Sequence, residues 1–360
     1  MKSTKINAVF VVKDEWPLLA LSVSHALLNY AQKAIIIDTG SQDGTFSGIK
    51  KLQQIFPQRI DFYSCPQNIF DQAPLANIGL YLSEIDGSDW TVFLDADEWL
   101  WCRDFSELRT QLGNTQSNFI GYAIPVINYA PFDGFNDLNL KDFLNVKSRV
   151  ESVGAYHLSD QVFMDAVLQG KTLLQERKTP DKVLLKSGSE AFITQGNHQL
   201  AFGDGIDWEK WDSRVASSLS VAWQIFHLPY TSVRRLERKL NRKFYDKQKT
   251  TWRLNTFERN HAISPSRLFA SAVISEKDRI AFEASGTIKF DQLFSDNLRT
   301  TIESLDEIWP VLLESEFSKS DLNHFQSSLD LNIVSGIVRK FFTKTSTLWG
   351  EKARHTEIGI

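Results

Sequence analysis

The first hundred residues alternate between short apolar runs and longer stretches in which apolar residues recur at helical spacing. Runs such as NAVFVV (7–12) and AIIID (34–38) lack polar alternation, which is typical of strands buried on both faces. The expected strands are 7–12, 34–38, 59–65 and 89–94, and the expected helices are 17–30, a segment ending near 56, and 73–84. This alternation predicts right-handed crossovers and an α/β fold with a mostly parallel sheet flanked by helices.

Beyond about residue 118 the pattern becomes irregular. Turn formers and aromatic residues dominate at first, and VFMDAVLQG predicts a short helix. Residues 181–186 and 191–194 are expected to form strands around a Ser-Gly-Ser turn. Residues 205–250 are expected to be helical, including a basic run from Val233 to Arg253 whose main interpretation is a solvated helix face. A soft boundary near 265 precedes a helical C-terminal region (265–360).

Acidic and turn-forming residues follow three of the expected strands. Lys13-Asp14-Glu15 follows the first, Asp38-Thr39-Gly40-Ser41 follows the second, and Asp95-Ala96-Asp97-Glu98 follows the fourth. Ligands of such sheets bind outside the carboxyl ends of the strands. One acidic turn alone is usually just solvated, but three at equivalent strand ends predict a functional site.

The Asp95-Ala96-Asp97 segment brings like charges together, which is costly unless a cation lies between them. Hard oxygen ligands select Mg²⁺ or Mn²⁺, and these ions often complete their shell with substrate phosphates. The alternative is a helix N-terminus decorated with acids that favour its dipole. Asp-x-Asp alone does not separate the two.

Composition narrows the class of protein. The 360 residues are 42% hydrophobic and 23% charged, with a net charge of −4 that does not indicate a nucleic-acid partner. Two cysteines fit a reducing compartment and exclude a disulfide framework. No apolar run approaches the roughly 20 residues of a membrane span. We therefore expect a cytoplasmic protein. Its 25 Phe and 10 Trp are expected mainly in the core, although some could form a stacking platform for a ligand ring.

Three segments together resemble family 2 glycosyltransferases of the GT-A fold, in the branch with an Asp-x-Asp-Glu metal loop. They are NAVFVVKDEWPLL, AIIIDTGSQDGT and WTVFLDADEWL, in that order, and the resemblance covers residues 5–101. It continues more thinly through DKVLLKSGSEAFITQGNHQL and FHLPYTSVRRLERKL. The stretch from 118 to 175 departs from the family pattern.

The resemblance implies roles for individual residues. Asp97 would ligate the metal and act on the diphosphate, and Glu98 would bind the sugar or brace the loop. Implied nucleotide-binding residues are Val12, Asp14, Glu15, Asp38, Gly40, Asp43, Asn77 and Asp95. Implied metal ligands are Asp95, Asp97 and His227, and implied diphosphate contacts are Lys182, His198 and the pair Arg234 and Arg235. His157 is an alternative late histidine.

The implied activity is metal-dependent sugar transfer, with Mn²⁺ or Mg²⁺, from a nucleotide diphosphate donor, expected to be a UDP-sugar. The acceptor would be a glycan or a lipid-linked molecule, as in polysaccharide biosynthesis, and the family's inverting chemistry requires a base. Asp133, Glu151, Asp204 and Asp207 are possible bases, and none is marked. The transferase domain would span 1–264, with a nucleotide-binding half (1–117) and an acceptor half (118–264).

Other interpretations remain. A non-catalytic nucleotide- or glycan-binding scaffold would keep the same fold. A HAD-type phosphohydrolase also uses Asp-x-Asp, but normally after the first strand of the chain. The segment KDEWP lacks the glycine fingerprint of a dinucleotide-binding enzyme. A C-terminal apolar stripe (333–342) with nearby basic residues predicts either a packed helix or a peripheral contact with the inner face of a membrane.

Overall fold

The computed structural model describes residues 4–65, 72–115, 119–151, 160–177, 179–189, 191–198, 200–201, 215–217, 222–241 and 264–314. Within these residues the main sheet has seven strands in the order β12-β6-β9-β4-β1-β2-β3. Their bounds are Val215–Ser217, Gly121–Ile124, Lys182–Lys186, Trp90–Phe93, Ile6–Val12, Lys33–Asp38 and Ile60–Ser64, in that order.

Strand directions confirm the expected α/β fold. β1 pairs in parallel with β2 and β4, and β2 pairs in parallel with β3. β9 lies between β4 and β6 and is antiparallel to both, while β12 runs parallel to β6. The carboxyl ends of β1, β2 and β4 therefore lie at one edge of the sheet, as the first hundred residues predict.

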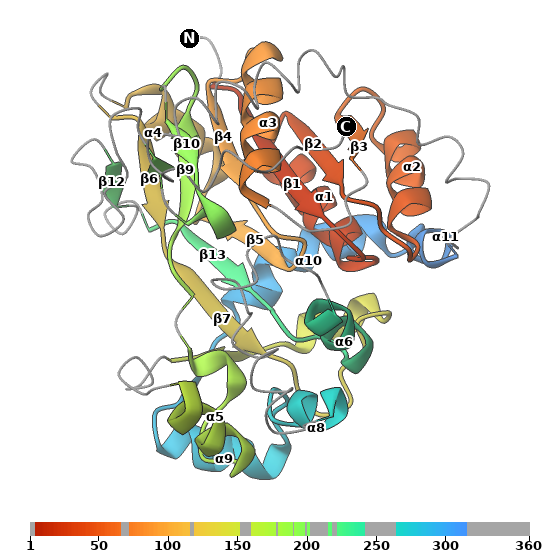
Figure 1. The fold of residues 1–360 in the computed structure, drawn as a ribbon, viewed down its shortest axis with the longest axis vertical. Helices are drawn as coiled ribbons and strands as arrows, with labels where there is room; N and C mark the ends of the chain where they lie inside the picture. Colours follow the sequence, from red (N-terminus) through yellow and green to blue (C-terminus); the bar gives the residue numbers. More distant parts are fainter. Residues whose placement is uncertain are drawn as a thin grey trace, which may run out of the picture.

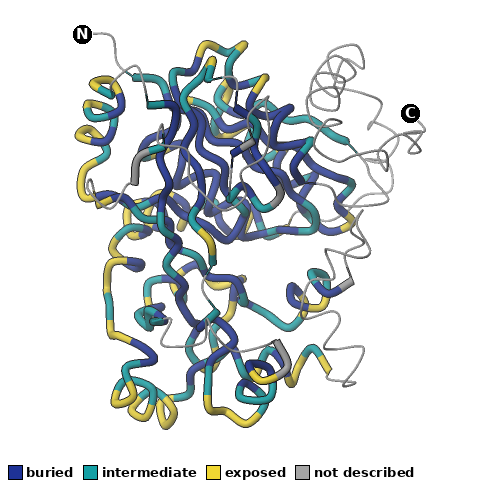
Figure 2. Tube along the Cα trace, turned by 60° about the vertical axis from the view of Figure 1, so that its left-hand side comes forward, coloured by how far each residue is buried: buried dark blue, intermediate teal, exposed yellow. Residues whose placement is uncertain are grey.

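Helices cover both faces of this sheet (Figure 1). α1 (Leu18–Asn29) and α2 (Thr45–Ile55) pack on the face that carries Phe10 and Ile36. α3 (Gln72–Ile85) packs on the opposite face, against Val9 and Ile35. Strands covered on both faces have no solvated side, which explains why β1 and β2 lack polar alternation. In Figure 2 the strands at the centre of the main sheet are almost continuously buried.

A second sheet within the described part of the chain has the order β14-β8-β7-β13-β5. Its strands span Ile288–Phe290, Ser148–Val150, Val126–Ala130, Gln224–His227 and Glu98–Trp101, in that order. β5 begins at the end of the acidic loop and pairs antiparallel with β13, so that Glu98 lies opposite His227. A short hairpin pairs β10 (Phe192–Ile193) with β11 (Leu200–Ala201).

The expectation that residues 205–250 are helical is wrong in part. β12 and β13 lie in this range, and α6 (Val233–Asn241) is its described helix. β13 is a four-residue run that is stabilised by pairing with β5 and β7, strands far away in sequence. Local periodicity does not carry such non-local pairing. The same reason applies to β6 and β7, in a stretch expected to be irregular.

The other described helices pack around the two sheets. They are α4 (Phe105–Gly113), η1 (Leu140–Asn145), α5 (Asp160–Leu168), η3 (Leu174–Glu176), η4 (Gln195–Asn197), α8 (Pro265–Ala270), α9 (Glu276–Ala284), α10 (Leu293–Leu305) and α11 (Trp309–Leu313). α10 packs against α1 and η1, directly on the core. No helix in the described ranges is long and apolar enough to cross a membrane. The expected stripe at 333–342 lies outside these ranges.

Candidate functional site

Two of the three predicted loops are held together by their own polar atoms. The Asp14 amide donates to Ser41 Oγ at 2.8 Å, and the Gln42 amide donates to Asp14 Oδ1 at 2.6 Å. Asp14 takes a positive φ of 56°, and Gly40 takes 90°, so both loops turn sharply at the strand ends. The carbonyl of Val12 accepts both the amide and the hydroxyl of Thr39. The loops after β1 and β2 therefore form one unit.

The buried side chain of Asp38 stabilises these two loops through Ser41. Its side chain has no exposed surface and accepts hydrogen bonds from the amide and the hydroxyl of Ser41. Burial raises the pKa of Asp38 to about 6, although the hydrogen bonds from Ser41 lower it in part. As placed, Asp38 shapes the loop rather than facing solvent, whereas Asp14 and Gly40 keep part of their surface accessible.

We expect Asp38→Asn to change how stability depends on pH. The folded-state pKa of about 6 lies above the ordinary 3.8, so the native protein binds the proton more tightly than the unfolded chain does. The wild type therefore loses stability as pH rises from about 4 to 6, by roughly 2–3 kcal/mol. Asparagine does not titrate, so the stability of the variant relative to wild type should rise by that amount over this interval.

The measurement is urea unfolding of both proteins at steps from about pH 4 to pH 7. Asp133→Asn, at an exposed position, controls for the loss of one negative charge elsewhere. A difference between Asp38→Asn and wild type that stays constant with pH would contradict the expectation.

The acidic loop after β4 is anchored by a buried lysine on β9. Lys182 Nζ lies 3.0 Å from Asp95 Oδ2 and 3.2 Å from Glu98 Oε2. The side chains of Lys182 and Glu98 are each 1% exposed, whereas that of Asp95 is 37% exposed. Burial would lower the pKa of Lys182, but Asp95 and Glu98 raise it above its ordinary value. Gln72, at the start of α3, donates to Asp95 Oδ1 at 2.8 Å.

Asp97 points to a different set of partners. Its Oδ2 atom lies 2.8 Å from Arg235 Nη2 and 2.7 Å from Lys239 Nζ, both on α6. Arg235 also reaches Glu15 Oε2, at 2.7 Å, and so joins the loops after β1 and β4. Burial by itself would raise the pKa of Asp97, but Arg235 and Lys239 hold it well below its usual range.

One helix thus contacts all three loops. Besides the contacts of Arg235 and Lys239, Arg238 Nη1 lies 2.8 Å from Asp43 Oδ2, in the loop after β2. Asp43 also accepts a hydrogen bond from the amide of Thr45, the first residue of α2, at 2.9 Å. Figure 1 shows α6 beside the carboxyl ends of β1 and β2.

The interpretation of most of the basic run as a solvated face is therefore wrong for residues 238 and 239, while Arg235, which was expected with Arg234 near a diphosphate, contacts the acidic loops. Arg234, the predicted diphosphate contact, is the exposed neighbour on the same helix. Positions 235, 238 and 239 share one helix face at i, i+3 and i+4 spacing, and that spacing was the available signal. Gln72, the Asp95 partner, carried no signal of its own.

Both late histidines lie near the acidic loop. His227 Nε2 is 3.6 Å from Asp97 Oδ2, and its Nδ1 is 2.8 Å from Asn128 Oδ1. Burial and then the charge of Lys182 lower the pKa of His198 to about 3, so this ring is neutral. The structure thus brings His227 to the predicted metal loop.

Other predicted residues are placed away from the loops or used by the fold. Asn77 donates to Ala73 O and Ile193 O and accepts from the Ile193 amide, which holds β10 on α3. Among the possible bases, Asp133 is exposed, and Glu151 follows β8 and pairs with Arg149. His157, Asp204 and Asp207 lie outside the described residues. The base stays unassigned.

The predicted divalent metal does not fit the side chains as they are placed. Of the residues that the structure describes, no group of three or more His, Cys, Asp or Glu could hold a metal ion. Asp97 already faces two cations, and both Asp95 oxygens accept from Gln72 and Lys182. A divalent ion at Asp97 would meet the like charges of Arg235 and Lys239 at close range.

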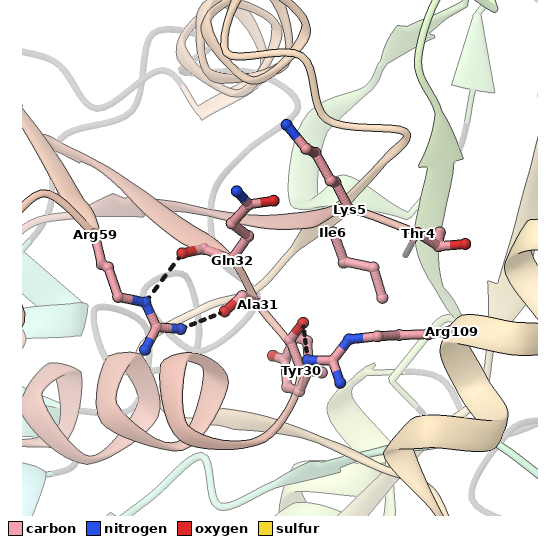
Figure 3. Close-up of a pocket in the computed structure, with 8 residues that line it drawn as sticks. All are labelled: Thr4, Lys5, Ile6, Tyr30, Ala31, Gln32, Arg59 and Arg109. Atoms are coloured by element: carbon pink, nitrogen blue, oxygen red, sulfur yellow. Dashed lines mark hydrogen bonds between the residues drawn. The ribbon is translucent and has the colours of Figure 1, made fainter. Parts of the chain in front are cut away.

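A pocket at the opposite end of the main sheet has a structural explanation (Figure 3). It has a volume of about 470 Å³ and is lined by Lys5 and Ile6 near the start of β1, among others. Arg59 donates to Leu27 O and Ala31 O, and Arg109 donates to Tyr30 O. These arginines satisfy carbonyl groups at the end of α1, as cations at a helix C-terminus do.

No protein-family model and no curated protein matches the chain. S. aureus TarS residues 1–349 in complex with UDP is similar at 10% identity and a TM-score of 0.36, covering 94% of this chain and 92% of that chain. The galactosyltransferase LgtC, in complex with donor and acceptor sugar analogs, is 20% identical over 33% of this chain and 46% of its own, with a TM-score of 0.23. The glycosyltransferase GlyE of Streptococcus pneumoniae is 13% identical over 34% of this chain and 30% of its own, also at 0.23.

Proposed function

We propose that the protein is a glycosyltransferase that moves a sugar from a nucleotide diphosphate donor, a UDP-sugar, to a glycan or lipid-linked acceptor. The observation that carries the proposal is the convergence of three acidic loops at one edge of a mostly parallel sheet. Glu15, Asp43 and Asp97 come from three different strand ends, and each is bound by a cation of α6. Ligands of α/β sheets bind at this edge.

The positions of these groups suit the parts of such a donor. Asp14 and Gly40 lie at the ends of β1 and β2 with accessible surface, where a nucleoside could be held. Asp95 and the α6 cations lie next to them, where the diphosphate and the sugar would follow. Buried charges that are already oriented stabilise developing charge without the reorganisation that water would need.

In the proposed transfer, the bond between the anomeric carbon and the diphosphate oxygen breaks. Its electron pair leaves with the diphosphate, and a bond forms from the anomeric carbon to the acceptor hydroxyl oxygen. The hydroxyl proton passes to a base. Inversion, a cytoplasmic location and a peripheral membrane contact through residues 333–342 belong to the same proposal and rest on the sequence resemblance and pattern alone.

The experiment is donor hydrolysis across a panel of UDP-, GDP- and dTDP-sugars, each with Mn²⁺, Mg²⁺ or EDTA. We expect nucleoside diphosphate release from one UDP-sugar, measured by chromatography. Titration calorimetry with UDP, GDP and dTDP on the same protein tests binding independently of turnover. A scaffold would bind nucleotide and never release it from a donor, even with a glycan acceptor panel added. Absence of both hydrolysis and nucleotide binding would overturn the proposed function.

A further inference from the structure

The cations on α6 are placed where they can bind a phosphate without abandoning their present partners. Lys239 Nζ contacts Asp97 Oδ2 and Pro229 O, and an ammonium group has a third proton to donate. Arg238 uses its Nη1 on Asp43, and a guanidinium carries five N–H donors. Their side chains are 12% and 22% exposed, so each keeps some accessible surface.

Arg235 lies about one helical turn before them on α6 and has a different environment. Its side chain is 7% exposed, and its guanidinium contacts Glu15, Asp97 and the carbonyl of Pro229. Nε donates to Glu15 and Nη1 donates to Pro229 O, while Nη2 lies within ion-pair distance of Glu15 and Asp97, so the Arg235 guanidinium is occupied by the fold. It fixes the start of α6 against the loops after β1 and β4, and so sets the positions of Arg238 and Lys239.

The charges of the three acidic loops explain why α6 is needed for a diphosphate to bind there. The acidic loops alone would repel a diphosphate. Glu15 and Asp97 are matched by Arg235 and Lys239, and Asp43 is matched by Arg238, so each acid in these contacts is neutralised. The remaining donors of Arg238 and Lys239 can then meet an anion at a locally neutral surface. Charge-assisted hydrogen bonds of this kind are about twice as strong as neutral ones.

We propose that Arg238 and Lys239 bind the diphosphate of the donor directly, in place of a divalent metal, with Arg235 as the positioning residue. The inference rests on the proposed function and goes further, because it assigns the hydrogen-bond donors that meet the leaving group to the chain itself. It also gives the acids of the Asp-x-Asp loop a role that differs from metal ligation: Asp97 anchors the lysine that faces the phosphate.

The test is UDP binding by titration calorimetry in EDTA and in Mn²⁺, with uridine as the ligand that lacks phosphates. We expect UDP to bind in EDTA within about threefold of its affinity in Mn²⁺. Lys239→Gln and Arg238→Gln should each weaken UDP binding by about 10- to 100-fold. Uridine binding, followed by saturation-transfer NMR, should be unchanged, which also shows that the variants are folded. Lys239→Arg keeps the charge and should retain most of the UDP affinity.

Lys277→Gln, on the exposed face of α9, removes the same unit of charge far from the loops and should leave UDP binding unchanged. UDP binding that is lost in EDTA and restored by Mn²⁺ would overturn the inference and leave the proposed function standing. Equal weakening of UDP and uridine by Lys239→Gln would also overturn it, because the role would then be structural. If neither ligand binds under any condition, the proposed function itself fails.

Discussion

Replacing Lys182 with methionine will lower the free energy of unfolding by about 3–5 kcal/mol, the usual cost of removing one partner of a buried ion pair. Methionine fills most of the volume but leaves the Glu98 carboxylate, 1% exposed, without its cation. The other partner, Asp95, is 37% exposed and can be solvated, so the cost falls mainly on Glu98. Urea unfolding followed by tryptophan fluorescence measures it.

Two features separate this cause from a general packing defect. The double variant Lys182→Met/Glu98→Gln should recover part of the loss, since no uncompensated buried charge remains. The deficit of Lys182→Met should also shrink as pH falls, because burial already raises the pKa of Glu98, loss of Lys182 raises it further, and the carboxyl becomes neutral once protonated. Lys186→Met, on the same strand at a half-buried position, is the control. A loss below about 1 kcal/mol in Lys182→Met would contradict the prediction.

Phe294→Ala will lower the free energy of unfolding by a similar amount, about 3–5 kcal/mol, through the cavity it leaves. Phe294, on α10, has no exposed surface and contacts the rings of Trp99, Tyr129 and Phe226 at centroid distances of 5.4, 4.9 and 6.2 Å. These three residues lie on β5, β7 and β13 of the second sheet. α10 therefore supports the strand that follows the acidic loop.

The measurement is denaturant unfolding by fluorescence and by far-UV circular dichroism, with coincident transitions expected from both probes. Phe290→Ala, at a position that is 59% exposed on β14, should cost less than about 1 kcal/mol. Two separate transitions, with the early one confined to a loss of helix signal, would show instead that α10 belongs to an independent C-terminal unit.

The sequence predicted those elements whose pattern of apolar residues is visible within a short stretch of the chain. β1, β2 and the helices that cover them were predicted within about two residues, because short apolar strands and longer helical segments alternate along this part of the sequence. The positions of the three acidic loops followed from strand direction alone. β5, β7 and β13 were not predicted, because short runs become strands only through partners that lie far away in the sequence.

The acids of the candidate site were predicted from the sequence, as were Lys182 and His227, whereas the contacts between α6 and the acidic loops were not. A carboxylate that follows a buried strand has its location fixed by the strand. Arg235 and Lys239 belong to a basic helix that could equally have faced water, and only the antiparallel pairing of β13 with β5 brings that helix to Asp97. Spacing shows which side chains share a face and does not show where the face points.

The pairing of β5 with β13 also has a consequence for synthesis of the chain. A nascent chain that ends at residue 117 already carries Glu15, Asp43 and Asp97, but it lacks Lys182 and the whole of α6. The loops of such a chain would hold several carboxylates without their cations. The carboxylates of the three loops therefore meet the cations of α6 only after residue 241 has left the ribosome. That is more than a hundred residues after Asp97 was made.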